Sequence, residues 1–439
     1  MKPVSTGPDA PTGAERRPNS DDEGSTLQGA QRRLNGRDHH HFDGRTRFRG
    51  GGGTAELQTG SFSDAQGAGG GALGRPGGGV SLRGASQSAD PIYGALDLGT
   101  NNCRLLLARP SRRGFRVVDA FSRIIRLGEG VSQTGQLSDQ AMNRTMEALK
   151  VCAGKLHRHR VTRARMVATQ ACRVAANGQS FVTKVRDDFG LDIEVLTPEI
   201  EARLAVAGCA TLVDPDAEFV LVFDIGGGSS EIIWLDMTRL GSRRDLLTGR
   251  TDINDAIVAW ESLPVGVVTL AERFDGRVVT PQSFAAMSDA VAQLLAPFEA
   301  AHRFREQLVG RRVHFLGTSG TVTTIAGVLL GLERYDRKRI DGIWLSLPEI
   351  EDVTSRLLGL GYEERVAEPC IGRERADLVL AGCAILDAIL KLWPAERLRV
   401  ADRGLREGIL MRLMMEDGVW RTGRRRRSRS RRPSNGSAP

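Results

Sequence analysis

One pattern occurs twice in this 439-residue chain, and it restricts the folds that the chain can adopt. In each copy an apolar run ends in an acidic residue, passes through a glycine-bearing turn and returns as a second apolar run, first over residues 96–107 and again over 222–235. Short apolar runs separated by such turns are typical of β-hairpins. Because alternating β and α patterns follow the first copy, the duplication predicts two similar α/β lobes whose turns meet across a cleft.

The remaining periodicity agrees with this arrangement. The expected strands cover residues 94–98, 104–108, 115–120, 124–127, 166–169, 193–196 and 219–223. One helix is expected to begin after Ser138, a residue type favoured at helix N-caps, and another to cover residues 198–212. We therefore predict a first lobe over residues 91–212 and a second lobe over residues 213–420.

The two ends of the chain differ from the segment between them. Residues 1–90 contain glycine runs and few apolar clusters, so they cannot bury enough surface to offset chain entropy, and we expect a disordered leader. Residues 421–439 carry eight arginines and no acid, which predicts a disordered basic tail. Of the net charge of +8, this tail supplies +8 and the first 89 residues +2, which leaves −2 between them. The tail is expected to contact polyanions non-specifically; a solubilising or RNA-binding tail is an equal alternative.

Cysteine usage and hydropathy indicate the compartment. The six cysteines include no Cys-x-x-Cys pair and lie mostly in apolar stretches, which favours reduced core thiols over disulfides or a zinc site. The leader lacks the apolar segment of a signal peptide, and no long uninterrupted apolar stretch occurs elsewhere. We expect a cytoplasmic protein with no membrane association, and a homodimer is an open alternative.

The second turn carries the strongest chemical signal. It reads Asp-Ile-Gly-Gly-Gly-Ser-Ser-Glu from Asp224 to Glu231. A run of glycines costs conformational entropy that a plain hairpin avoids, so something is expected to approach the backbone closely there. Bare amides in such a turn bind anions, and the two carboxylates can supply the oxygen ligands that Mg²⁺ prefers.

Two further turns are less specific. The first, at residues 97–102, offers glycine, hydroxyl and amide groups to a phosphate, but an ordinary hairpin turn explains it equally well. The third, at residues 317–321, ends a strand and opens a helix, whose N-terminus attracts anions; a helix cap is an equal alternative. It is not a nucleophile elbow, because Thr321 stands where that motif needs glycine.

Taken together, these turns, the stretch at residues 263–268 and the closing Asp-Arg-Gly-Leu-Arg-Glu-Gly at 402–408 resemble the exopolyphosphatase/guanosine pentaphosphate phosphohydrolase (Ppx/GppA) phosphatase family. The resemblance spans residues 92–415. It implies two actin-like (ribonuclease H-like) lobes and a phosphohydrolase that uses Mg²⁺ or Mn²⁺. Its implied substrates are inorganic polyphosphate and the guanosine alarmone pppGpp.

The resemblance also implies roles for residues. Glu201 matches the family's water-activating carboxylate; from the sequence alone it is only a favourable acid near a helix N-terminus. Arg173 is expected at a strand end facing the cleft, where it would bind a phosphate; a surface arginine is the alternative. Asp224 and Glu231 would hold the metal ion. The expected phosphate-binding residues are Asp97, Gly99, Thr100, Asn101, Gly226, Gly227, Gly228, Ser229, Ser230, Gly317, Ser319 and Gly320.

Several features separate this chain from its expected relatives or leave alternatives open. Residues 238–260 form a charged insertion that we expect to be an exposed loop. No histidine follows His314, so the His/Asp metal-binding domain of the longer family members is not expected here. An ATP-dependent kinase, a regulatory ATPase and an alarmone-binding protein on the same fold remain alternatives, because fold does not fix function.

Overall fold

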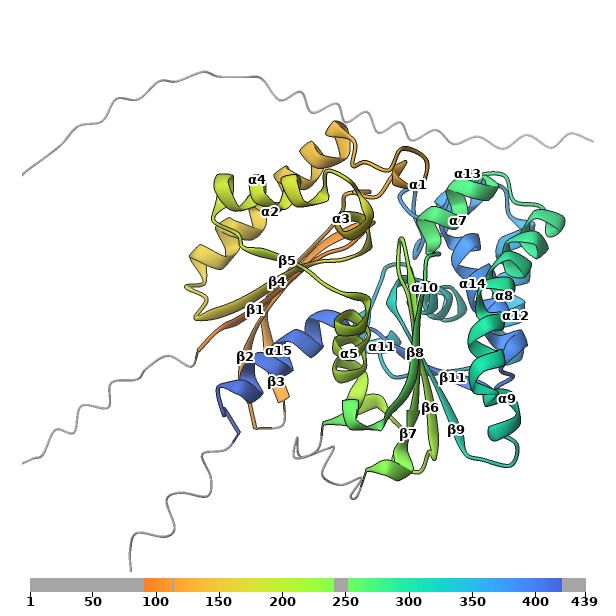
Figure 1. Ribbon diagram of the computed structural model, residues 1–439. Helices are drawn as coiled ribbons and strands as arrows, with labels where there is room; N and C mark the ends of the chain where they lie inside the picture. The colour runs from red at the N-terminus through yellow and green to blue at the C-terminus, as the bar shows by residue number, and fades with distance from the viewer. Residues whose placement is uncertain (1–90, 113, 241–251, 421–439) are drawn as a thin grey trace, which may run out of the picture. The chain divides into compact units, whose positions relative to one another are not determined.

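A computed structural model describes residues 91–112, 114–240 and 252–420 of the chain. Its first sheet has the strand order β3-β2-β1-β4-β5 (Figure 1). The strands are β1 (Tyr93–Leu98), β2 (Asn102–Ser111), β3 (Gly114–Ile124), β4 (Arg163–Ala168) and β5 (Ile193–Val195). The first three strands form an antiparallel meander, and β4 and β5 extend it in parallel.

The second sheet repeats this plan in the order β8-β7-β6-β9-β11-β10. Its strands are β6 (Phe219–Ile225), β7 (Ser230–Asp236), β8 (Ile257–Leu263), β9 (Val313–Thr318), β10 (Trp344–Ser346) and β11 (Arg397–Ala401). Here too a meander is continued by parallel strands, and β10 adds an antiparallel edge. The duplicated α/β architecture predicted from the repeated hairpin is confirmed.

Helices connect and cover the two sheets (Figure 1). In the described part of the chain, four helices lie between strands of the first sheet: α1 (Val131–Thr134), α2 (Asp139–Arg158), α3 (Gln170–Val174) and α4 (Gly178–Phe189). Helix α5 (Pro198–Cys209) follows its last strand. Later in the chain come α7 (Val267–Phe274), α8 (Pro281–His302), α9 (Phe304–Gln307), α10 (Ser319–Leu329), α11 (Arg337–Ile340), α12 (Leu347–Gly359), α13 (Tyr362–Ala367), α14 (Val379–Leu392) and α15 (Leu405–Glu416). Ser138 caps α2 as expected, because its hydroxyl accepts a hydrogen bond from Ala141 N.

Separate apolar cores lie on the two sheets. In the core of the second sheet, Trp234 of β7 is fully buried and stacks on Phe304 with ring centroids 4.7 Å apart. It packs in one cluster with the buried residues of α8 and α14. In the first, Leu96 and Leu105 pack with Leu149 of α2. Fully burying a side chain of this size contributes about 1.5–3 kcal/mol, so these clusters hold each sheet to its own helices.

Helix α15 follows the second sheet in the chain but packs on the first. Ile409 and Leu410 of α15 share a buried cluster with Tyr93 and Leu106 of the first sheet and with Leu204 of α5. Helices α5 and α15 cross with their backbones in contact. A Cβ atom at Gly208 would lie 1.9 Å from Gly404 O, and one at Gly408 would lie 2.0 Å from Leu204 O. The predicted division of the chain near residue 213 stays a prediction.

Two expected elements are wrong. Residues 124–127 are not a separate strand: β3 ends at Ile124, and Arg126 adopts a left-handed φ of 47° that no strand allows. The predicted exposed loop at 238–260 ends earlier than expected, because residues 257–260 belong to β8 and pair with β7. These four residues, Ile-Val-Ala-Trp, are apolar and suit a strand, but they directly follow a charged stretch and were assigned to the same loop.

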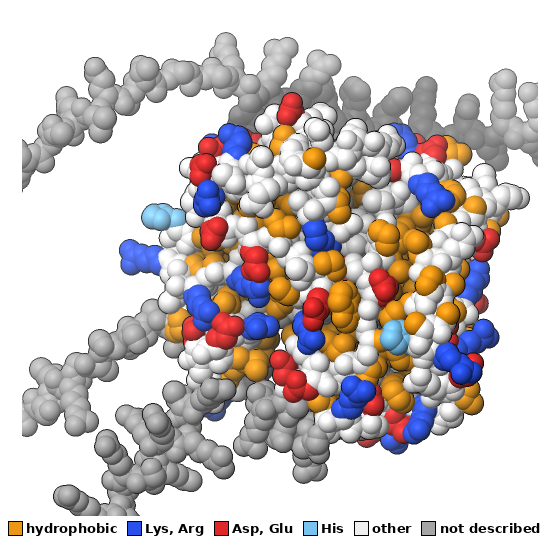
Figure 2. All heavy atoms as spheres, viewed as in Figure 1, with side chains coloured by type: hydrophobic (Ala, Val, Ile, Leu, Met, Phe, Trp, Pro, Cys, Tyr) orange, Lys and Arg blue, Asp and Glu red, His pale blue; other side chains and the backbone are white. Residues whose placement is uncertain are grey.

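The leader, the Arg-rich tail and the centre of the insertion lie outside the described residues. All six cysteines are described, buried and without a disulfide, as expected. None of the helices within the described ranges has the length and apolar character that crossing a bilayer requires. Acidic and basic side chains are interspersed over the face shown in Figure 2.

Candidate active site

A cavity of about 620 Å³ lies where the turns of the two sheets meet. This is an ordinary volume for a small-molecule site. Its wall combines the first turn, the second turn, the beginning of α10, Glu201 of α5, and the segments 369–375 and 402–407. The expected cleft between two similar turns is therefore present.

The register of the two hairpins determines which charged side chains face each other. Asp97 on β1 pairs with Arg104 on β2, and Asp224 on β6 pairs with Glu231 on β7. Directly opposite residues of an antiparallel pair share one face of the sheet, and all four residues line the cavity. The two hairpins thus share an aspartate at one position, Asp97 and Asp224, and carry opposite charges at the other, Arg104 and Glu231. Arg104 was missed from the sequence, although counting the hairpin register from Asp97 would have found it.

The glycines of the second turn allow the two turns to touch. A Cβ atom at Gly227 would lie 3.0 Å from Thr100 Cβ and 3.2 Å from Asn101 N, and one at Gly228 would lie 2.8 Å from Thr100 Oγ1. A Cβ atom at Gly266, before α7, would come within 2.4 Å of the Gly227 carbonyl carbon. The close approach expected at this turn is therefore made, at least in part, by the protein's own backbone.

Glu231 is buried and Asp224 is partly buried, and each accepts hydrogen bonds from serines. Ser319 Oγ donates to Asp224 Oδ1, and Glu231 Oε1 accepts from Ser229 Oγ at 2.8 Å and from Ser262 Oγ at 3.0 Å. Burial raises the pKa of Asp224 against the effect of the Ser319 bond. Burial and then the neighbouring Asp224 raise the pKa of Glu231 to about 7, while its two serine bonds lower it. Arg104 and Arg173 oppose these shifts from a distance, but neither carboxylate forms an ion pair within the described residues.

Glu201 lies in the first turn of α5, which Thr197 caps and Pro198 begins. Its side chain is buried, and Oε2 accepts a hydrogen bond from Arg173 Nη1 at 3.0 Å. Burial, and next the charge of Glu231, raise the pKa of Glu201 well above its usual value; the ion pair with Arg173 opposes this shift. A buried carboxylate with a raised pKa beside other acids has the electrostatics of a proton acceptor.

Arg173 does not lie at the predicted strand end. Strand β4 ends at Ala168, and Arg173 lies on the short helix α3 instead of at a strand end. Its Nη1 also donates to Leu196 O at 2.8 Å, and its Nη2 donates to Gln170 Oε1 at 2.7 Å. Arg173 is not among the residues that line the cavity, so in this structure it contacts Glu201 and not the open site.

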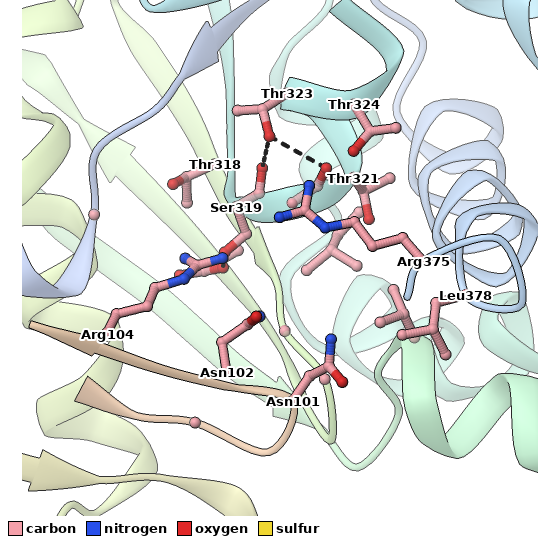
Figure 3. A pocket seen from close by; sticks show the side chains of 18 of the residues that line it. Asn101, Asn102, Arg104, Thr318, Ser319, Thr321, Thr323, Thr324, Arg375 and Leu378 are labelled. Atoms are coloured by element: carbon pink, nitrogen blue, oxygen red, sulfur yellow. Dashed lines mark hydrogen bonds between the residues drawn. The ribbon is translucent and has the colours of Figure 1, made fainter. Parts of the chain in front are cut away.

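The beginning of α10 forms another wall, seen in Figure 3. Ser319 has a φ of 76°, which costs energy in a residue other than glycine and is a feature of functional sites. Thr323 Oγ1 donates to the backbone carbonyl of Ser319 at 2.9 Å. From the opposite side, the Arg375 side chain extends toward Ser319 and Thr321 (Figure 3). Polar groups from several elements therefore converge here.

The expected phosphate-binding residues divide into two groups. Those that line the cavity are Asp97, Gly99, Thr100, Asn101, Gly226, Gly227, Gly228, Ser229, Ser319 and Gly320. Gly317 and Ser230 do not line it. A Cβ atom at Gly317 would lie 2.7 Å from the Phe223 ring, and Ser230 Oγ donates to Val265 O at 2.7 Å, so both residues have packing contacts instead.

Several basic residues of the cavity were missed. They are Arg104, Arg337, Arg373, Arg375, Arg403 and Arg406. Arg337 pairs with Glu407 at 2.8 Å, whereas the side chains of Arg104 and Arg406 make no hydrogen bond or ion pair within the part of the chain that the structure describes. Arg406 belongs to the closing motif already noted in the sequence, which was the signal for it. No local pattern indicated Arg375.

The carboxylates suit a divalent cation. Over residues 91–112, 114–240 and 252–420 no group of three or more His, Cys, Asp or Glu side chains is arranged as a complete metal site. Mg²⁺ shared with a phosphate, however, needs only one or two protein carboxylates. Asp224 and Glu231, which face the cavity side by side with raised pKa values, fit that requirement.

Comparison with known families agrees with this geometry. The family model described as the Ppx/GppA phosphatase family matches residues 107–417. The chain belongs to this family. Among solved structures, a Ppx/GppA family member from Aquifex aeolicus is 26% identical, with a TM-score of 0.60, over 74% of this chain and 98% of its own. An exopolyphosphatase from Cytophaga hutchinsonii is also 26% identical, with a TM-score of 0.63, over 74% of this chain and 98% of its own.

Membership of the Ppx/GppA family explains the architecture described above. The family's two actin-like lobes account for the duplicated sheets. The match covers nearly the full length of both solved relatives.

Proposed function

We propose that this Ppx/GppA protein is a phosphohydrolase that removes the terminal phosphate of inorganic polyphosphate, the 5′-phosphate of pppGpp, or both, by attack of water. The observation that carries the proposal is the position of Glu201: a buried carboxylate with a raised pKa lines the same cavity as Asp224 and Glu231. The exopolyphosphatase from Cytophaga hutchinsonii with a similar fold supports polyphosphate as one substrate.

In this proposal Glu201 is the general base. Its ionised carboxylate accepts a proton from the attacking water, and its raised pKa brings it nearer to neutral pH, where such a base works best. Arg173, hydrogen-bonded to Glu201 at 3.0 Å, keeps the carboxylate in place. Stabilisation of the transferring phosphoryl group by Arg173 itself, as predicted from the sequence, would require its guanidinium to turn toward the cavity.

The substrate phosphates would be held by groups from both lobes. Thr100 and Asn101 act from the first turn, the backbone of residues 226–229 from the second, and Ser319 and Gly320 from the start of α10. Arg104 supplies a positive charge on the same wall, and its side chain forms no ion pair with another described residue. Asp224 and Glu231 would hold Mg²⁺ or Mn²⁺, which when bound neutralises charge on the phosphoryl oxygens.

Release of orthophosphate from polyphosphate, pppGpp and ATP, measured in parallel at fixed Mg²⁺, tests the proposal. We expect release from one or both of the first two substrates, and Glu201→Gln to lower kcat by about 10²–10⁴-fold, the usual contribution of a positioned base. Gln keeps the volume of Glu and loses the basic lone pair. Turnover of ATP alone would indicate a kinase or regulatory ATPase, and tight pppGpp binding without turnover would indicate an alarmone-binding protein. Undiminished activity of Glu201→Gln would remove Glu201 from the mechanism.

A further inference from the structure

The segment between β3 and α1 contacts both sides of the cavity. On its own side, Ile125 N and Arg126 N donate to Asn101 O at 2.9 and 3.1 Å, and Gly128 N donates to Thr100 O at 2.9 Å. A Cβ atom at Gly128 would lie 2.3 Å from Thr100 Cγ2. The segment is therefore bonded directly to the first turn, and the two cannot move independently.

The same segment reaches residues that follow the second sheet's meander. Arg126 Nη1 donates to Asp377 Oδ2 at 2.9 Å and Nη2 donates to Asp377 Oδ1 at 3.0 Å, a two-bond arrangement that fixes direction as well as distance. Arg126 Nη2 also donates to Glu374 O at 3.2 Å. Nearby, Glu272 of α7 accepts from Gly130 N at 2.8 Å and from Ser132 Oγ at 2.6 Å.

The conformation of Arg126 is unfavourable on its own. Its φ of 47° lies in the left-handed region, which is strained for a residue other than glycine and persists only where surrounding contacts impose it. Here those contacts are the two bonds to Asn101 O and the pair with Asp377. The Arg126 and Asp377 side chains are 30% and 19% exposed, so water screens this pair only partly.

The other end of the contact is itself firmly held. Arg365 is 1% exposed, and its guanidinium donates to the carbonyl of Ala376, the residue before Asp377, at 3.1 Å and to Arg277 O, in the connection after α7, at 2.7 Å. A Cβ atom at Gly276 would lie 1.9 Å from Asp377 O. Two residues from Asp377, Arg375 and Val379 line the cavity. Asp377 is thus a fixed point beside the cavity wall.

We propose that Arg126 is a positioning residue that couples the first turn, through Asp377, to the cavity wall at residues 369–375 and 378–379. It thereby sets the separation at which Thr100 and Asn101 can act on a substrate together with that wall. The ligand in this proposal rests on the proposed function; the coupling does not. Loss of the pair should leave the reacting groups intact and weaken substrate binding, because the first turn would no longer be held at its working distance.

Hydrogen exchange of the free protein tests the coupling without any substrate. Asp377→Ala, made on the opposite side of the cavity, should accelerate exchange of the amides of Ile125, Arg126 and Gly128. The matched control is Glu194→Ala, which breaks the ion pair of Glu194 with Arg165 inside the first sheet, at 3.0 Å, and should leave these amides unchanged. If Asp377→Ala unfolds the protein, which would appear as faster exchange throughout, Asp377→Asn replaces it. Unchanged exchange at the three amides in a folded variant overturns the proposal.

Kinetics with inorganic tripolyphosphate add a double-mutant test. Arg126→Ala and Asp377→Ala should each raise KM about tenfold and change kcat less than about threefold, and the double variant should be no worse than either single one. Arg126→Lys, which keeps the charge and loses the two-bond geometry, should fall between. Additive effects would mean that the residues act separately and would overturn the coupling. If no form of the protein acts on tripolyphosphate, the proposed function fails, while the exchange experiment still decides the role of Arg126.

Discussion

Arg173 Nη1 lies 3.0 Å from Glu201 Oε2, and this contact joins a short helix after β4 to the first turn of the helix that follows β5. Residues 28 positions apart in sequence thereby share one charge pair at the edge of the cavity. Two opposing influences act on Glu201, because burial and Glu231 favour its protonated form while Arg173 favours the ionised form. The balance between them determines the pH at which Glu201 can accept a proton.

Replacing Arg173 should move the pH–rate profile in a defined direction. Arg173 lowers the pKa of Glu201, so Arg173→Ala should raise that pKa further, and the acidic limb of kcat should shift to higher pH, with a lower kcat at neutral pH. The measurement is kcat from pH 5 to 9, with Arg165→Ala as the control for loss of an arginine. A profile that keeps its acidic limb, with KM raised instead, would favour direct phosphate binding by Arg173.

Asp224→Asn should raise the Mg²⁺ concentration that gives half-maximal rate. A neutral amide is a poorer ligand for a small divalent cation than a carboxylate, and Asp224 lines the cavity without an ion pair to any residue that the structure describes. Titration of Mg²⁺ at saturating substrate measures the change. The same Mg²⁺ dependence in both proteins would assign Asp224 to the turn through its Ser319 hydrogen bond.

Glu231 should make the metal-free protein less stable as pH rises. Its pKa is about 7 in the folded protein, above the usual value of 4.5, so the folded state holds the proton more tightly than the unfolded state. Stability from this group is therefore full below about pH 4.5 and is lost as pH rises through 7. In chelator-treated protein, Tm should fall between pH 5 and 8, and Glu231→Gln should reduce that fall. An equal fall in both proteins would contradict the expected shift.

Gly408→Ala should destabilise the fold by about 1–3 kcal/mol, the usual cost of adding a methyl group to a filled contact. The added Cβ would lie 2.0 Å from Leu204 O, so α5 and α15 would have to separate. Gly154→Ala is the matched control, because Gly154 is also helical but has nothing within 4 Å of a Cβ atom, and it should stabilise slightly. Urea denaturation compares the two. Equal urea midpoints for the two variants would mean that α5 and α15 accommodate the added methyl group without loss of stability.

Local sequence features predicted those parts of the site that lie within one hairpin or at one strand end. The turn at 224–231 and Ser319 were found because glycines and small residues follow apolar runs. Arg104 could have been predicted in the same way, because it pairs in register with Asp97 in the first hairpin. The position of Arg173 was wrong because one short helix after β4 changes where its side chain points.

Contacts made by tertiary packing had no signal in the sequence. Arg126 and Asp377 are 251 residues apart, and each lies in a connection without a periodic pattern. Arg375 also lies in such a connection, between α13 and α14. Hydrophobic periodicity fixes which face of an element is buried, but it does not say which distant loop will cover it.

The packing of α15 on the first sheet has a consequence for how the chain is made. Synthesis proceeds from the N-terminus, so Tyr93, Leu106 and Leu204 leave the ribosome about 200 residues or more before Ile409 and Leu410, which cover them. Until then the first half of the chain has one apolar face with no partner. Its folding is therefore completed last, although it is translated first, and any nascent chain that stops before residue 405 presents a ready surface to chaperones and proteases.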